Sequence, residues 1–170
     1  MKAENDSISV RPACRQEEFL WEGLPLIRCE FRMPSLAGPG RGAHRIDRYY
    51  RRVEELILRR LRSLSPKFSL LAQRALSASL PIPHCRVWTD FETAFQDERF
   101  LSIRWSLMTE GSVTHHCDLW ELPWGAPVSP KLLLPRSLHR KASSAPCLVR
   151  ADGVYLLREE GEERIFARED

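Results

Sequence analysis

Hydrophobic and polar residues alternate along several stretches of the chain, which is the pattern of half-buried β-strands. These stretches are residues 25–34, 85–95, 100–108 and 113–120. The last three follow one another with only short polar loops between them, as in an antiparallel meander. Two or three shorter strands close the chain and are separated by turn sequences that contain glycine.

A helical spacing of apolar residues separates the first strand from the meander. Ile46 begins an apolar stripe that continues at helical spacing to Leu64, and arginines fill the opposite side. Ser65 and Pro66 then form a good N-cap and first-turn pair, which predicts a second helix that ends before residue 81. The predicted fold class is therefore α+β: an antiparallel meander sheet with two consecutive helices packed on one face.

The domain organisation follows from length and from the stretches that lack a period. A chain of 170 residues fits one domain, which buries roughly 70% of its unfolded surface at this size. Residues 1–20 are polar and aperiodic, so we predict a flexible N-terminal arm there and a single α+β domain over 21–170. A Pro-rich, basic stretch at 123–146 also lacks a period and is predicted to be a surface excursion.

The loop that precedes residues 113–120 decides which side chains of that strand are buried. A three-residue loop at 109–111, with Gly111 in a left-handed bulge position, places Leu107 opposite Val113. A two-residue loop would shift the pairing by one residue and bury Asp118, at a cost of several kcal/mol unless the carboxylate is paired. The three-residue loop is therefore the preferred prediction.

With this register, His115 and Cys117 join the apolar face that the helices cover. The opposite, open face then gathers two tryptophans and an arginine, residue types that are enriched where partners dock. The candidate binding residues on it are Trp88, Arg104, His116, Asp118 and Trp120. Two other interpretations stay open: a solvated face with its charges in cross-strand pairs, and a face covered by 123–146. If Trp120 is a binding anchor, Trp120→Ala weakens partner binding without unfolding the domain.

Metal-binding and catalytic chemistry is thinly signalled. The predicted pleat sends the imidazole of His116 to the face opposite Cys117, and His84 starts a strand about 9.6 Å away at ~4.8 Å per strand. The five cysteines are odd in number and no C-x-x-C occurs. Nucleophile-elbow, P-loop, H-E-x-x-H and dinucleotide motifs are absent from the sequence. We therefore predict no catalytic residues, no metal and no cofactor; the alternative is a zinc hydrolase using His84, His115, His116 or Cys117.

Charge is mild overall but unevenly distributed. The net charge is +3, yet residues 41–62 hold eight arginines against three acids. Acidic residues interrupt the basic helix and no aromatic is interleaved on its outer side, so a solvated face is expected and nucleic acid is not an expected partner. The N-terminus has no apolar signal-peptide core and no window is apolar enough to span a bilayer, which predicts a cytoplasmic protein that does not bind membranes.

Short motifs within residues 24–160 resemble those of a known family. Ile46-Asp47 with Tyr49 and Tyr50 is similar to the "IN-x-YY" helix start of the small α+β domain of RsiV-type anti-sigma factors, which also occurs in PdaC-type polysaccharide deacetylases of Firmicutes. Leu101-Ser102-Ile103 resembles its "LSI" strand, Gly111 its turn, and Asp118 the end of its next strand. The family's "TGK" segment is replaced here by "WGAPVSPK". The resemblance implies a non-catalytic recognition domain.

The function predicted from sequence is thus a non-enzymatic domain that recognises a protein or glycan partner through its open sheet face. In RsiV-like proteins the corresponding role is binding lysozyme. No residue of this chain licenses transferring that ligand.

Overall fold

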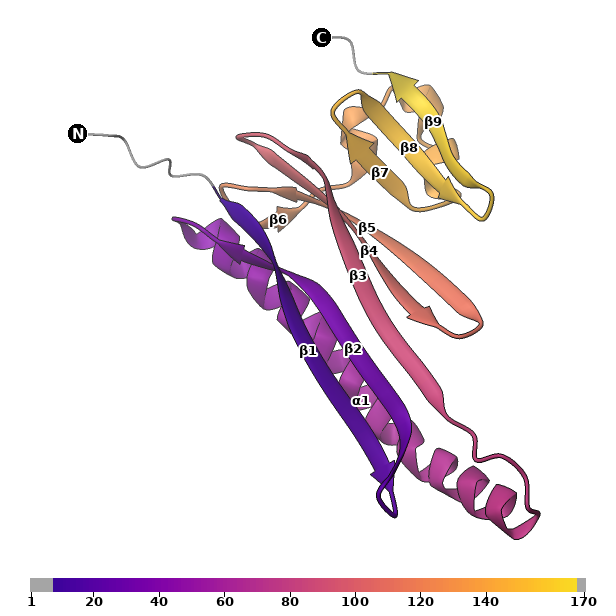
Figure 1. Ribbon diagram of the computed structural model, residues 1–170. Helices are drawn as coiled ribbons and strands as arrows, with labels where there is room; N and C mark the ends of the chain where they lie inside the picture. Colours follow the sequence, from indigo (N-terminus) through magenta and orange to yellow (C-terminus); the bar gives the residue numbers. More distant parts are fainter. Residues whose placement is uncertain (1–7, 168–170) are drawn as a thin grey trace.

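The computed structural model describes residues 8–167 and has an α+β fold, as predicted (Figure 1). One sheet contains six strands in the order β1-β2-β3-β4-β5-β6. Their bounds are β1 Ser9–Trp21, β2 Leu24–Ala37, β3 Cys85–Gln96, β4 Phe100–Thr109, β5 Ser112–Glu121 and β6 Ala126–Pro127. All neighbours are antiparallel except β2 and β3, which are parallel because the helix between them carries the chain back along the sheet.

The two predicted helices are one continuous helix, α1, from Arg41 to Ser77, with Pro66 inside it. The prediction of a break at Ser65 is therefore wrong. Pro66 lies on the exposed side of α1, where the carbonyl that it leaves without a donor can bond to water. The apolar stripe also stays in phase across the proline, since Ala72 and Ala75 are buried on the side that carries Ile46.

The N-terminal segment is a strand over residues 9–21, so the prediction of a flexible arm there is wrong; residues 1–7 lie outside the described residues. β1 pairs with β2 along its whole length. Its polar side chains are held by ion pairs rather than by a buried face: Arg15 contacts Glu54 and Glu55 of α1 at 3.1 and 2.8 Å. A strand at the border of a sheet can be polar on both sides, which hid this one from a period-2 search.

A second, three-stranded sheet closes the chain, which confirms the short strands predicted there. Its strands are β7 Cys147–Arg150, β8 Gly153–Arg158 and β9 Gly161–Ala167. The predicted excursion at 123–146 holds β6 and three short 3₁₀ helices, Pro130–Leu133, Arg136–Leu138 and Lys141–Ser143. It is not purely a surface segment, because Leu134 and Ala142 are buried with Leu119 of β5 and Val149 of β7.

The main core lies between α1 and one face of the six-stranded sheet. Ile46, Tyr50 and Leu58 of α1 are fully buried there and pack with residues of β4 that include Ile103 and Trp105. The C-terminal part of α1 extends beyond the β1–β2 hairpin (Figure 1). Among the described residues, no helix is both long and apolar enough to cross a membrane.

The start of α1 packs closely against the turn after β5, and this contact gives a testable prediction. A Cβ on Gly42 would lie 1.9 Å from the carbonyl oxygen of Leu122 and 2.9 Å from the amide nitrogen of Gly125. Gly42→Ala is therefore expected to lower the free energy of unfolding by about 1–3 kcal/mol, despite the better helix propensity of alanine. Gly111→Ala is the control, since nothing lies within 4 Å of its added Cβ. Urea unfolding of both variants measures the difference; equal midpoints would contradict the close contact.

Candidate functional site

The β4–β5 hairpin sets the geometry of every candidate residue. Thr109 pairs with Ser112 and Met108 with Val113, so only Glu110 and Gly111 form the turn. The predicted three-residue loop is therefore wrong, and so is the assignment of the side chains of residues 113–120 to the two faces of the sheet. The left-handed bulge expected at Gly111 is also missing, because Gly111 is not among the glycines with positive φ.

Asp118 is tolerated on the helix-facing side because it is hydrogen-bonded by two aromatic side chains. Its Oδ2 accepts from the Tyr50 hydroxyl and from Nε1 of Trp105, both at 3.0 Å. The Tyr50 hydroxyl in turn accepts from Nε1 of Trp120 at 3.0 Å. The two-residue loop requires Asp118 to be buried, and its carboxylate is stabilised there by a hydrogen bond from Tyr50 of α1. Tyr50 is 68 residues distant from Asp118 in sequence.

Burial shifts the ionisation of this cluster. It raises the pKa of the Asp118 carboxyl above its usual value, and the hydrogen bonds from Tyr50 and Trp105 act against that shift. Burial also raises the pKa of Tyr50 and lowers that of His116, whose ring stacks on Trp105 with centroids 3.9 Å apart. The cluster is a buried polar network whose donors and acceptors satisfy one another.

The five candidate residues are consequently divided between the two faces. His116, Asp118 and Trp120 lie on the helix-facing side, and only Trp88 and Arg104 lie on the outer face. Trp120 is 4% exposed and forms edge contacts with Tyr49 and Tyr50. Trp120 is a core residue, so the prediction that it anchors a partner on an open face is wrong.

The outer face is ordered in rows that run across β3, β4 and β5. The first row is apolar and consists of Trp88, Met108 and Val113, which are direct cross-strand neighbours. The second row is Asp90, Ser106 and His115, and the third is Glu92, Arg104 and Cys117. Beyond them, Ser102 and Leu119 are buried under the second sheet and the 3₁₀ segments. The face is therefore covered at one end and open at the other.

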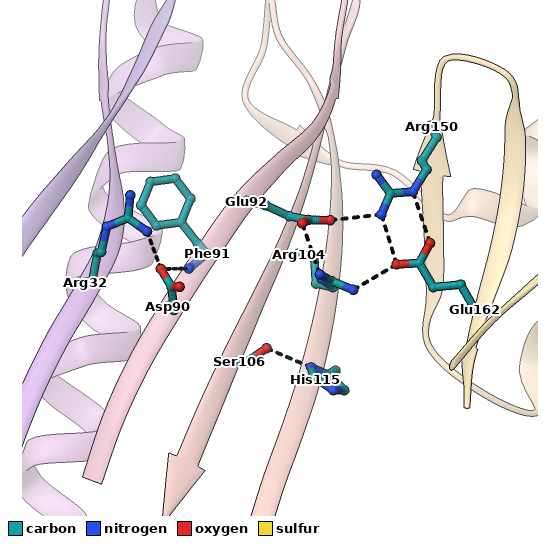
Figure 2. Close-up of polar contacts among 9 residues, drawn as sticks. All are labelled: Arg32, Asp90, Phe91, Glu92, Arg104, Ser106, His115, Arg150 and Glu162. Carbon is teal, nitrogen blue, oxygen red and sulfur yellow. Dashed lines mark hydrogen bonds and ion pairs between the residues drawn. The ribbon is translucent and has the colours of Figure 1, made fainter. Parts of the chain in front are cut away.

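A network of four charged side chains marks the border of the covered part (Figure 2). Arg104 bonds Glu92 of β3 at 3.0 Å and Glu162 of β9 at 2.8 Å. Arg150 of β7 bonds the same two carboxylates at 3.1 and 2.9 Å. The hydrogen bond from Arg150 lowers the pKa of Glu162. Arg104 therefore joins the two sheets and is not free to receive a ligand.

The open part of the face keeps its charges in cross-strand pairs. Arg86 contacts Glu30 of β2 at 2.8 Å and lies 5.4 Å from the ring centre of Trp88. Arg32 pairs with Asp90, and Ser106 is 2.7 Å from Nδ1 of His115 (Figure 2). Val113 is 55% exposed, whereas Trp88 and Met108 are partly exposed and belong to neither hydrophobic core. The apolar row is thus surrounded by charges that are already neutralised.

The histidines and cysteines do not converge. Within residues 8–167, no group of three or more histidine, cysteine or acidic side chains could hold a metal ion. His115 and His116 point to opposite faces, and His84 is exposed near Glu110. Burial raises the pKa of Cys117 to about 12, which leaves its thiol protonated and weakly nucleophilic at neutral pH.

Neither the hydrogen-bonding partners Tyr50 and Trp105 nor the apolar row was predicted from the sequence. Both residues lie within the apolar patterns of their elements, and the Tyr50 hydroxyl and Nε1 of Trp105 were available as hydrogen-bond donors. These two donors could have suggested hydrogen-bonding partners for a buried aspartate. Met108 and Val113 could not be joined to Trp88 without the correct register.

No known protein family matches the chain, and no curated protein is detectably similar to it.

Proposed function

We propose that this protein is a non-enzymatic recognition domain that binds a partner protein through the open part of its outer sheet face. The observation that carries the proposal is the apolar row Trp88, Met108 and Val113 on three adjacent strands, outside both hydrophobic cores. An aromatic residue flanked by apolar neighbours is the usual centre of a binding surface. The sequence resemblance to the RsiV-type domain predicts the same class of function and stays a prediction.

The surroundings of the row also support a binding role. Arg86, Glu30, Arg32 and Asp90 form a rim of paired charges, whose desolvation on docking costs less than that of isolated charges. The row spans only three strands, which suits a small patch of contact rather than an obligate interface. A glycan that stacks on the indole ring is the other partner class that this row could accept.

The zinc hydrolase alternative has no comparable support. The described residues provide no group of side chains that could hold a metal ion. The thiol of Cys117, which follows the two histidines, is protonated at neutral pH. We do not carry that alternative further.

Trp88→Ala is expected to weaken binding of the physiological partner by about tenfold or more, as for truncation of a central aromatic anchor. The matched control is Trp124→Ala, because Trp124 is 67% exposed and lies in the loop after β5, away from the row. A crosslinking pull-down from the native lysate identifies the partner with wild-type protein, and titration calorimetry then compares the variants. Equal affinities for wild type and Trp88→Ala, with the fold intact, would remove the proposal.

A further inference from the structure

β5 is an incompletely paired strand. It pairs with β4 over its whole length, but with β6 only at Trp120 and Glu121. The chain then leaves the sheet after Val128, whose amide donates to the carbonyl of Leu119 at 2.7 Å. Residues 112–118 of β5 therefore form a border of the sheet.

Two hydrogen bonds fix which backbone groups of β5 face outward. The Leu122 amide donates to the Arg99 carbonyl, on the β4 side, and the Leu119 carbonyl accepts from Val128 on the other side. In an antiparallel ladder this direction alternates with every residue. The amide and carbonyl groups of Val113, His115 and Cys117 therefore point away from β4, and no backbone group within the described part of the chain bonds to them.

The opposite border of the sheet is protected in a way that this one is not. β1 carries Pro12 and four charged side chains, Arg11, Arg15, Glu17 and Glu18. Proline and charge are the features with which natural border strands prevent further pairing. The segment 112–117 of β5 contains neither proline nor any lysine, arginine, aspartate or glutamate. This segment therefore lacks the features that prevent a further strand from pairing with it.

Hollows lie at both ends of the unpaired segment. One of 300 Å³ is lined by Cys117, Asp118 and Val128, where β6 ends. Another of 400 Å³ lies on the side of the second sheet and is lined by Val113, His115 and Leu157 among others. An added strand sends alternate side chains to opposite sides of the sheet, so each hollow has a side chain to receive.

The α1 side of this border is positively charged. Arg45 and Tyr49 of α1 line the 300 Å³ hollow, and Arg52 lies on the same flank of the helix, seven residues after Arg45. The acids of α1 are engaged elsewhere: Asp47 pairs with Arg51 at 2.9 Å, and both glutamates pair with Arg15 of β1. Arg45 and Arg52 have no carboxylate partner within residues 8–167.

We propose that the β5 border binds an extended acidic segment of a partner protein, which joins the sheet as an added strand along Val113–Cys117. The backbone groups of three alternate residues hold the segment, and Arg45 and Arg52 select acidic side chains on the side of α1. Five residues of β5 span about 17 Å, enough for a short linear motif. This site goes beyond the proposed function, because it depends on the backbone of β5 and not on the indole of Trp88.

The test uses a synthetic peptide of alternating glutamate and valine, titrated into the full chain and followed by NMR. Saturable binding is expected below about 1 mM, the weak end of peptide recognition, with new exchange protection at the amides of Val113, His115 and Cys117. His115→Pro removes an outward amide without removing a bond to β4, and should weaken binding about tenfold. His115→Ala keeps that amide and is the matched control, expected to bind within about twofold of wild type.

A second pair of variants tests the charge and remains informative if the proline variant unfolds. The double substitution Arg45→Glu and Arg52→Glu should weaken binding of the acidic peptide by at least about tenfold at low salt. Arg62→Glu is the control on another side of the helix and should leave binding of this peptide within about twofold of wild type. A peptide of alternating lysine and valine should bind much more weakly than the acidic one.

Several results would overturn the proposal. They are the absence of saturable binding by about 1 mM, equal binding of the lysine peptide, and full binding by a folded His115→Pro variant. Tight binding of a single-stranded oligonucleotide at the arginines, without protection of the three amides, would make this a nucleic-acid surface instead. A dimer in sedimentation that His115→Pro abolishes would show that the border pairs with a second copy of the chain.

Discussion

Replacing Trp120 with alanine is expected to lower the free energy of unfolding by about 3–5 kcal/mol, the usual cost of deleting a buried tryptophan. Trp120 is 4% exposed, and its ring contacts both Tyr49 and Tyr50. Its Nε1 also donates to the Tyr50 hydroxyl, so the substitution removes one member of the buried network as well as apolar area. Urea unfolding followed by circular dichroism measures the loss.

The matched control is Trp124→Ala, four residues further along the chain. Trp124 is 67% exposed, so its removal should change the free energy of unfolding by no more than about 0.5 kcal/mol. A small effect of Trp120→Ala, equal to that of the control, would mean that the indole at 120 lies on the surface. That outcome would restore the register predicted from sequence.

Asp118→Ala is expected to lower the free energy of unfolding by about 2–4 kcal/mol. Nε1 of Trp105 and the Tyr50 hydroxyl would both lose their acceptor inside the core, and each orphaned donor costs about 1–3 kcal/mol. Asp118→Asn keeps a carbonyl oxygen at the same place and removes the buried charge. It should therefore be much less destabilising than Asp118→Ala, which thermal unfolding of the two variants measures directly.

A comparison of Asp118→Asn with wild type tests the ionisation of Asp118. Burial raises the pKa of this carboxyl in the folded state, so its protonated form is favoured by folding. Its contribution to stability is fully present below the pKa of the unfolded chain and is lost as the pH rises through the folded pKa. The stability of Asp118→Asn relative to wild type should consequently rise as the pH increases from about 4, the usual pKa of an unfolded aspartate, through the raised pKa of the folded state. Both proteins retain His116, but the charge of Asp118 raises the pKa of His116, so Asp118→Asn lowers the His116 pKa further. This coupling adds to the expected rise, because a lower folded pKa of a histidine makes stability increase with pH. Parallel pH profiles would contradict the buried carboxylate.

Local sequence patterns predicted the elements that depend on local spacing. The alternation of β3 and β4 placed Trp88 and Arg104 on one face, which the pairing confirms. The apolar stripe that begins at Ile46 predicted which side of α1 packs on the sheet, and Ile46 and Tyr50 on that side are both fully buried. These features follow from the period of each element alone.

The features that were mispredicted depend on residues distant in sequence. The register of β5 was decided against burying Asp118, but Tyr50 supplies its hydrogen bond from α1. β1 is mostly polar and its Arg15 pairs with acids of α1, so a search for an apolar face could not detect this strand. Ser65-Pro66 has the local signature of a helix start, yet the apolar stripe that continues beyond it keeps α1 intact. In each case a tertiary contact outweighs the local preference.

The direction of the backbone along β5 underlies both the division of the candidate residues and the open border of the sheet. Residue-resolved amide hydrogen exchange of the free protein measures it most directly. The amides of Thr114, His116 and Asp118, which bond to β4, should exchange slowly, and those of Val113, His115 and Cys117 should exchange rapidly. The reverse alternation, with protected amides at 113, 115 and 117, would contradict the register and the binding border that depends on it.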